Sequence, residues 1–160
     1  MKRTSAVAVT AACTLLAAAV VGVAGAAAPK QPALPPLPAG TVRVVAKLDT
    51  VQVVPAPTGA VAGATGEFAA TFDGAILRFS LGWAHLSGTA TSAQIHLGRR
   101  KSPGPLVQPI CVPCFFSPED GVVPLLPWQV AALKVGRLYV SIQTDADPGG
   151  EIRGQLSIVK

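Results

Sequence analysis

The sequence predicts an all-β protein: an antiparallel, immunoglobulin-like or Greek-key β-sandwich of about seven or eight short strands. Many of its segments alternate apolar and polar residues with a period of two, which buries one set of side chains and leaves the other toward water. Turn residues separate these segments, and the 160 residues include 16 glycines and 15 prolines. Only residues 128–135 offer room for a helical turn. Short strands with frequent turns and almost no helix are typical of a sandwich or a closed barrel.

Residues 137–156 carry the clearest strand pattern. Leu138, Val140 and Ile142 occupy alternate positions, and apolar residues alternate again from Ile152. Between the two strands, residues 145–150 read Asp-Ala-Asp-Pro-Gly-Gly, in which proline fixes φ and glycine allows positive φ. We predict a hairpin here, with Arg137, Tyr139, Ser141 and Gln143 facing water.

The remaining strands follow from the same alternation and from turn signals. We expect strands at residues 42–49, 51–54, 67–72, 76–86 and 90–97, and a weaker one at 106–112. Asp73-Gly74 is a strong hairpin signal between two of them. Residues 111–127 contain four prolines and are expected to form a loop. Residues 128–135 are expected to form a short helix, closed by Gly136.

The N-terminal residues indicate export. Lys2 and Arg3 precede an apolar run, and Ala24-Gly-Ala26 supplies the small residues that a signal peptidase reads. We therefore expect a signal peptide at residues 1–26, with cleavage after Ala26 and secretion or delivery to the cell envelope. The alternative is a retained membrane anchor, since about 20 apolar residues suffice to span a bilayer.

The rest of the chain divides into a linker and one domain. Residues 27–40 contain five prolines and are expected to form an extended linker. Residues 41–160 are expected to form the β-sandwich domain, a length sufficient for one hydrophobic core. We expect no transmembrane span once the signal peptide is removed.

Two cysteines remain after loss of Cys13 with the signal peptide, namely Cys111 and Cys114. An exported chain folds in an oxidising compartment, so we expect a disulfide between them. The spacing also matches thiol oxidoreductases and half of a zinc site. A redox pair, however, is expected to open a helix, whereas this one lies between prolines in a β protein.

The net charge of +5 falls to +3 when Lys2 and Arg3 are removed. The one basic cluster in the sequence, Arg99-Arg100-Lys101, has no aromatic residues interleaved with it. Nucleic-acid binding requires a broader basic face, so we expect no nucleic-acid partner and interpret this cluster as a solvated turn.

Several polar residues share the outward positions of the predicted strands. These residues are Gln94, His96, Gln143, Glu151 and Arg153. They suggest either a binding site or a cross-strand hydrogen-bond network with a Glu–Arg pair.

Two histidines, His85 and His96, are too few for a redox copper site, which needs three or more imidazoles. We expect no catalytic residue, metal or cofactor. Asp145, Asp147 and Glu151 are expected to cap the last turn rather than to bind calcium.

Four stretches of the sequence form a recognisable set, namely Ser92-Ala-Gln-Ile-His-Leu-Gly98, Gly104-Pro105, Leu138-Tyr-Val-Ser-Ile-Gln-Thr144 and Pro148-Gly-Gly-Glu-Ile-Arg-Gly-Gln-Leu156. Together they resemble the chordin (CHRD) domain family, and with residues 48–58 the resemblance covers roughly residues 41–158. The resemblance implies an exported immunoglobulin-like β-sandwich with no established catalytic activity. Its motifs place Gln94, His96, Gln143, Thr144, Glu151 and Arg153 in the polar patch. The same motifs give structural roles to Gly98, Gly104, Pro105, Tyr139, Gly150 and Gly154.

The chain departs from the family pattern at two histidines. The family commonly has His-Ile-His where this chain has Gln94-Ile-His96, and Asn-Val-His-Thr where it has Ser141-Ile-Gln-Thr144. We therefore expect a non-catalytic module that binds an extracellular or cell-envelope protein or polymer. The alternatives are a superoxide-dismutase-like metalloenzyme and thiol–disulfide exchange through Cys111 and Cys114.

Overall fold

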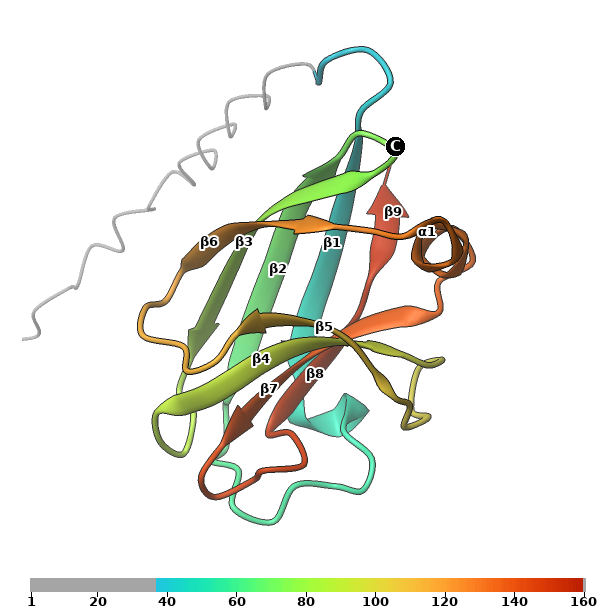
Figure 1. The fold of residues 1–160 in the computed structure, drawn as a ribbon. Helices are drawn as coiled ribbons and strands as arrows, with labels where there is room; N and C mark the ends of the chain where they lie inside the picture. Colours follow the sequence, from blue (N-terminus) through green and yellow to red (C-terminus); the bar gives the residue numbers. More distant parts are fainter. Residues whose placement is uncertain (1–36, 160) are drawn as a thin grey trace, which may run out of the picture. The chain divides into compact units, whose positions relative to one another are not determined.

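The computed structural model describes residues 37–159, which form nine β-strands, one α-helix and one short 3-10 helix (Figure 1). The strands are β1 (Val42–Asp49), β2 (Thr65–Phe72), β3 (Ile76–Ala84), β4 (Ala90–Leu97), β5 (Leu106–Cys111), β6 (Glu119–Pro124), β7 (Leu138–Thr144), β8 (Ile152–Gln155) and β9 (Ser157–Val159). The helices are η1 (Thr50–Gln52) and α1 (Pro127–Lys134).

All strand pairs are antiparallel, and the strands belong to one hydrogen-bonded sheet in the order β5-β4-β7-β8-β1-β2-β3-β6. The two end strands, β5 and β6, lie near each other, so the sheet curls into a nearly closed barrel. The all-β antiparallel prediction is confirmed. The division into two sheets of an immunoglobulin-like sandwich is not confirmed, because β8 pairs with β7 on one side and with β1 on the other.

The C-terminal strand is interrupted at Leu156, which is fully buried in the core. Before it, β8 runs beside β7, and after it, β9 pairs with residues Arg43, Val44 and Val45 of β1. Residues 152–159 therefore pair with β7 through β8 and with β1 through β9.

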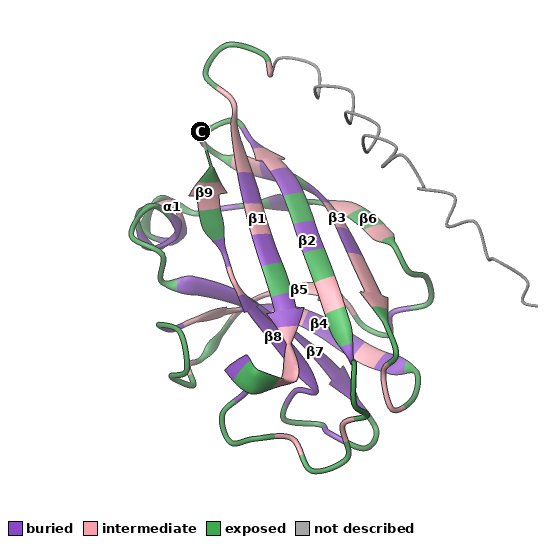
Figure 2. Ribbon diagram, turned by 180° about the vertical axis from the view of Figure 1, so that it is seen from behind, coloured by how far each residue is buried: buried purple, intermediate pink, exposed green. Residues whose placement is uncertain are grey.

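Alternating side chains fill the interior, as the period-two pattern predicts. Figure 2 shows the alternation of buried and exposed residues along β2. Phe68 and Phe79 stack at a centroid distance of 5.5 Å in the middle of the core. The largest fully buried apolar side chains are Leu48, Phe68, Leu77, Leu81, Ile95, Leu133, Leu138, Ile142, Ile152 and Leu156.

The predicted hairpin at 137–156 forms, but β7 differs from the expectation that one of its faces meets water. All seven residues of β7 are buried (Figure 2). Tyr139, Ser141 and Gln143 lie on the face opposite the core, and each is at most 6% exposed. On this face Tyr139 contacts His96, Arg153 and Gly104 of the loop at 98–105, and Gln143 contacts Ser92 of β4.

Four local predictions need correction. Residues 51–54 do not form a strand, because Asp49 caps the 3-10 helix η1 by accepting a hydrogen bond from the Gln52 amide. Residues 111–127 are not all loop, since β6 pairs with β3 from Glu119 to Pro124. The strand predicted at 76–86 ends at Ala84, before His85 with its φ of 57°. Residues 128–135 do form a helix, but it begins one residue earlier, at Pro127.

The predicted signal peptide and most of the predicted linker lie outside the described residues. Among residues 37–159, none of the helices has the length and apolar character that crossing a bilayer requires.

Candidate functional site

The residues of the predicted polar patch, except Glu151, lie on three adjacent strands, β4, β7 and β8. The register places His96 opposite Tyr139, Gln94 opposite Ser141, and Ser141 opposite Arg153. The fold therefore brings together residues that are up to 59 positions apart in the sequence. What they form is a covered network rather than an open patch.

The centre of this network is the ring of Tyr139, which lies between a histidine and an arginine. The His96 imidazole stacks on Tyr139 with centroids 5.0 Å apart and planes inclined by 11°. The guanidinium carbon of Arg153 lies 3.4 Å from the centre of the same ring. Because β7 runs between β4 and β8, the two cationic or potentially cationic groups approach from neighbouring strands on its two sides.

Arg153 is 3% exposed, and its partners are backbone carbonyls rather than a carboxylate. Its Nη2 donates to the carbonyl oxygens of Arg99 at 2.6 Å and of Ser102 at 2.9 Å. Burial lowers the pKa of the guanidinium, an effect that Tyr139 partly opposes. The charge is retained all the same, because an arginine loses its proton only far above neutral pH. Arg153 thus fixes the backbone of the loop at 98–105 through two hydrogen bonds from the buried side of the loop.

A chain of side-chain hydrogen bonds runs beside this stack. The hydroxyl of Ser92 donates to Gln143 Oε1 at 2.7 Å and accepts from the Gln94 amide at 3.4 Å. The two glutamines that replace family histidines therefore take part in the network.

His96 ends this chain and fastens the loop. Its Nδ1 lies 3.1 Å from the Gly104 carbonyl oxygen, and its Nε2 lies 3.1 Å from Gln94 Oε1. A neutral imidazole carries one N–H, so it can donate to only one of these two oxygens, to Gly104 through Nδ1 or to Gln94 through Nε2. Burial lowers the pKa of His96, the positive charge of Arg153 lowers it further, and the Gly104 carbonyl opposes both.

Gly104 and Gly154 are required where two backbones approach closely. A Cβ on Gly104 would overlap the Leu97 carbonyl group, and one on Gly154 would lie 2.6 Å from the Lys47 carbonyl oxygen. The Gly104 amide also donates to the Tyr139 hydroxyl oxygen at 3.2 Å, and the Pro105 carbonyl accepts from the Leu97 amide at 3.0 Å. Gly98 donates to the Arg137 carbonyl, and Gly150 has a φ of 120° in the last turn.

Glu151 and Thr144 belong to a second, separate cluster at the other end of β7. Glu151 is fully buried and accepts from the Ser87 amide at 2.7 Å, the Ser87 hydroxyl at 2.6 Å and the Thr144 hydroxyl at 2.8 Å. Its partners differ from those of Arg153, so the expected Glu151–Arg153 pair does not form. Instead, Glu151 ties the last hairpin to the turn before β4.

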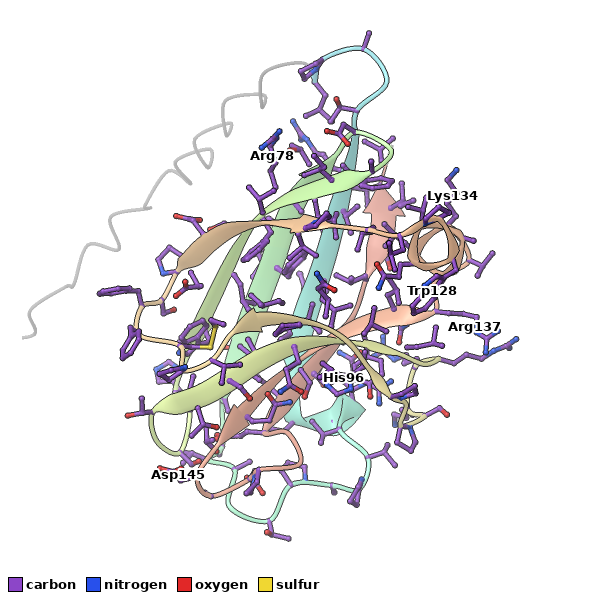
Figure 3. The ribbon with its side chains drawn as sticks, viewed as in Figure 1. Arg78, His96, Trp128, Lys134, Arg137 and Asp145 are labelled. Carbon is purple, nitrogen blue, oxygen red and sulfur yellow. A yellow bond between two sulfur atoms is a disulfide. The ribbon has the colours of Figure 1, made fainter. Side chains whose placement is uncertain are left out.

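Asp147 and Glu151 do not cap the last turn as predicted, because their carboxylates bind other segments. Asp147 is buried and accepts from the amides of Thr58 and Gly59 at 2.8–3.1 Å, which fastens the loop at 53–64. Asp145 is exposed, at the outer end of the hairpin (Figure 3). The described residues contain no group of three or more His, Cys, Asp or Glu side chains placed to hold a metal.

His85 does not lie on a strand face as the alternation predicted. It is exposed beyond the end of β3 in a left-handed conformation. His96, in contrast, lies half-buried on β4. The two imidazoles therefore belong to different environments, and no pattern in the sequence marked the end of β3 at Ala84.

Cys111 and Cys114 are joined by a disulfide, as predicted, with Cα atoms 5.0 Å apart. The loop that follows exposes Phe115 and Phe116, at 75% and 72%. Ser117 fastens its far end by donating to the Trp83 carbonyl and accepting from the Trp83 amide, both at 2.8 Å. A shallow groove of about 570 Å³ lies beside it, lined by Trp83 and Pro118 among others. No pattern in the sequence indicated this groove.

The fold and the network define a class of protein: an antiparallel β-barrel whose characteristic polar side chains hold loops in place. The residues from 44 to 156 match the model of the CHRD domain family. The chain belongs to the CHRD domain family, as the sequence motifs indicated. No curated protein and no solved structure matches this chain.

Proposed function

We propose that this chain is a secreted or cell-envelope CHRD-domain protein that binds an extracellular or cell-envelope partner and catalyses no reaction. One observation carries the proposal. The polar side chains of the family motifs are engaged with one another and with backbone groups, in the chain Gln143–Ser92–Gln94–His96 and in the bonds of Arg153. Because the hydrogen-bonding groups of these side chains are already occupied, they stabilise the fold and its loops and do not contact a substrate.

Export is supported by two independent features. The apolar run ending in Ala24-Gly-Ala26 has the pattern of a signal peptide. The Cys111–Cys114 disulfide is the state expected in an oxidising compartment. Both features favour a location outside the cytosol.

The chemistry of the donor set argues against a superoxide-dismutase-like role. Both ring nitrogens of His96 already lie at hydrogen-bonding distance from protein groups. Its nearest side-chain partner is the amide of Gln94, and amides are poor ligands for copper and zinc. Thiol–disulfide exchange is disfavoured by position, because Cys114 is buried and lies in a loop rather than at the start of a helix.

The test uses exported protein without a histidine tag. We expect an intact mass that begins at Ala27, no titratable thiol, no dismutase activity and no stoichiometric metal after dialysis against copper and zinc. One tightly held metal equivalent that disappears in His96→Ala would overturn the non-catalytic assignment. Reduction of insulin by the protein would overturn it in favour of thiol exchange. A pull-down from envelope extract with the exported chain as bait then looks for the partner.

A further inference from the structure

We propose that one corner of the domain is a docking surface for an anionic phospholipid bilayer. This corner, called the basic corner below, consists of the five exposed cations Arg99, Arg100, Lys101, Lys134 and Arg137. The inference rests on the proposed exported binding role and goes beyond it by naming a lipid surface as the partner.

The fold joins two basic segments that are far apart in the sequence. The Gly98 amide donates to the Arg137 carbonyl at 2.8 Å. The Gln155 amide nitrogen donates to the carbonyls of Gly98 and Gly136, at 2.9 Å each. The loop that carries the first three cations is thereby tied to the segment that carries Lys134 and Arg137. Figure 3 shows Lys134 and Arg137 on the same side of the domain.

The positive charge is concentrated at this corner although the domain is nearly neutral. Residues 37–159 contain nine lysines and arginines and eight acids, and five of the nine cations lie in the basic corner. Asp145 lies on the other side of the domain (Figure 3). Asp49 is closer, opposite Arg153, but both its carboxylate oxygens accept hydrogen bonds from Gln52. A local excess of one sign attracts an oppositely charged surface even at a small net charge.

Arg153 orders the basic corner before any partner arrives. Its two hydrogen bonds to the Arg99 and Ser102 carbonyls fix the backbone of the loop from the buried side. A loop that is already ordered loses less conformational entropy on binding, so more of the attraction remains as affinity.

Apolar side chains beside the cations favour a bilayer over a soluble polyanion. Leu126, Trp128 and Val135 are 57%, 50% and 68% exposed on α1 and at its two ends. Trp128 and Val135 are seven residues apart and so share one helix face. Figure 3 shows Trp128 on the side that carries Lys134 and Arg137. Tryptophan prefers the headgroup region of a membrane, and neighbouring cations bind anionic lipids. A soluble polyanion would engage the cations but leave the aliphatic groups in water.

The first measurement is vesicle binding by exported protein whose mass shows that residues 1–26 are removed. The chain has two tryptophans, so the Trp83→Phe variant reports on Trp128 alone. With vesicles of phosphatidylcholine and phosphatidylglycerol at 3:1, we expect co-sedimentation and a blue shift of Trp128 emission. With phosphatidylcholine alone we expect neither. In 1 M salt the Debye length falls to about 3 Å, so the bound protein should be released.

The second measurement compares matched variants, each checked for native circular dichroism. Arg100→Gln/Arg137→Gln should weaken binding about 30-fold, since each cation near an anionic surface contributes about fivefold. Lys47→Gln/Arg78→Gln removes the same charge from exposed positions on β1 and β3 and should leave binding unchanged. Trp128→Ser should weaken binding, whereas Phe115→Ser/Phe116→Ser should not.

Three results would overturn the proposal. The first is absence of binding to the mixed vesicles, or equal binding to vesicles without phosphatidylglycerol. The second is equal weakening by the two charge variants, which would point to net charge alone. The third is binding to dextran sulfate without binding to vesicles, which would assign the basic corner to a soluble polyanion. Each leaves the metal and activity tests of the proposed function unaffected.

Discussion

The guanidinium carbon of Arg153, on β8, lies over the ring of Tyr139, on β7, at 3.4 Å from its centre. This buried cation has two carbonyl partners and an aromatic face, while its Nε is without a hydrogen-bond partner. The contact explains how a polar side chain on the outer face of a strand becomes part of the interior. It also makes Arg153 one of the residues that hold the loop at 98–105, together with His96 and Gln155.

Arg153→Ala should lower the free energy of unfolding by about 2–4 kcal/mol, because it removes two charge-assisted hydrogen bonds and a desolvated cation–π contact. Arg153→Lys should recover less than half of this loss, since an ammonium group cannot reproduce the planar stack. Urea denaturation measures both. The exposed Arg78→Ala serves as the control, with an expected change within about 0.5 kcal/mol. An unchanged midpoint for Arg153→Ala would contradict the structural role.

Stability should fall as the pH decreases from 7 to 5, and His96 should be the main cause. Its pKa in the folded protein lies below the ordinary 6.5 of the unfolded chain. The unfolded state therefore binds a proton more readily, and the stabilisation present above pH 6.5 is lost as the pH falls toward the folded pKa. Denaturation at several pH values should show this slope in the wild type and in His85→Gln. In His96→Gln the slope should disappear, and its persistence there would refute the assignment.

Gly154→Ala should destabilise the domain by at least about 2 kcal/mol, because its Cβ would meet the Lys47 backbone at 2.6 Å. Gly82→Ala is the matched control, in β3, where a Cβ meets nothing within 4 Å. An open strand position should gain up to about 1 kcal/mol from alanine. Thermal unfolding of the two variants should thus shift in opposite directions. Equal shifts would show that the close approach of β8 to β1 is relaxed in solution.

Opening the Cys111–Cys114 disulfide should cost at most about 2 kcal/mol, because the closed loop is short. Ser117 would still fasten the far end of the loop to Trp83. Melting with and without reductant, and in Cys111→Ala/Cys114→Ala, measures the effect. Collapse of the near-UV circular dichroism on reduction at 25 °C would mean that the disulfide supports far more than its own loop.

Local sequence patterns predicted most of the strands because alternation and turn residues report directly on the backbone. The Asp73-Gly74 hairpin forms as expected, with Asp73 accepting from the amides of Ala75 and Ile76. β6 was not predicted because Pro118, Gly121 and Pro124 interrupt the alternation of apolar and polar residues. An edge strand nevertheless tolerates such residues. The 3-10 helix at residues 50–52 depends on the Asp49 cap, which competed with the β-branched residues that suggested a strand.

The candidate site was harder to predict, since alternation tells the two faces of a strand apart but not what covers the second face. Tyr139 and Gln143 occupy outward positions, yet both are buried, because Tyr139 contacts His96, Arg153 and the loop at 98–105 while Gln143 contacts Ser92. The grouping of Gln94, His96 and Arg153 was anticipated from parity. The separation of Glu151 from Arg153 was not, because Glu151 precedes β8 and turns toward Ser87.

The pairing of β1 with β9 also bears on when the domain can form. β1, the first strand along the chain, pairs with β9 at Ser157–Val159, which lies more than 110 residues later in the sequence. Contacts at such separation require closure of a long loop and form slowly. If the chain crosses a membrane starting with its N-terminus, β1 therefore cannot complete its pairing until β9 has also crossed. Such a delay would keep the polypeptide unfolded during transport, and the barrel would be completed only after the whole chain has crossed.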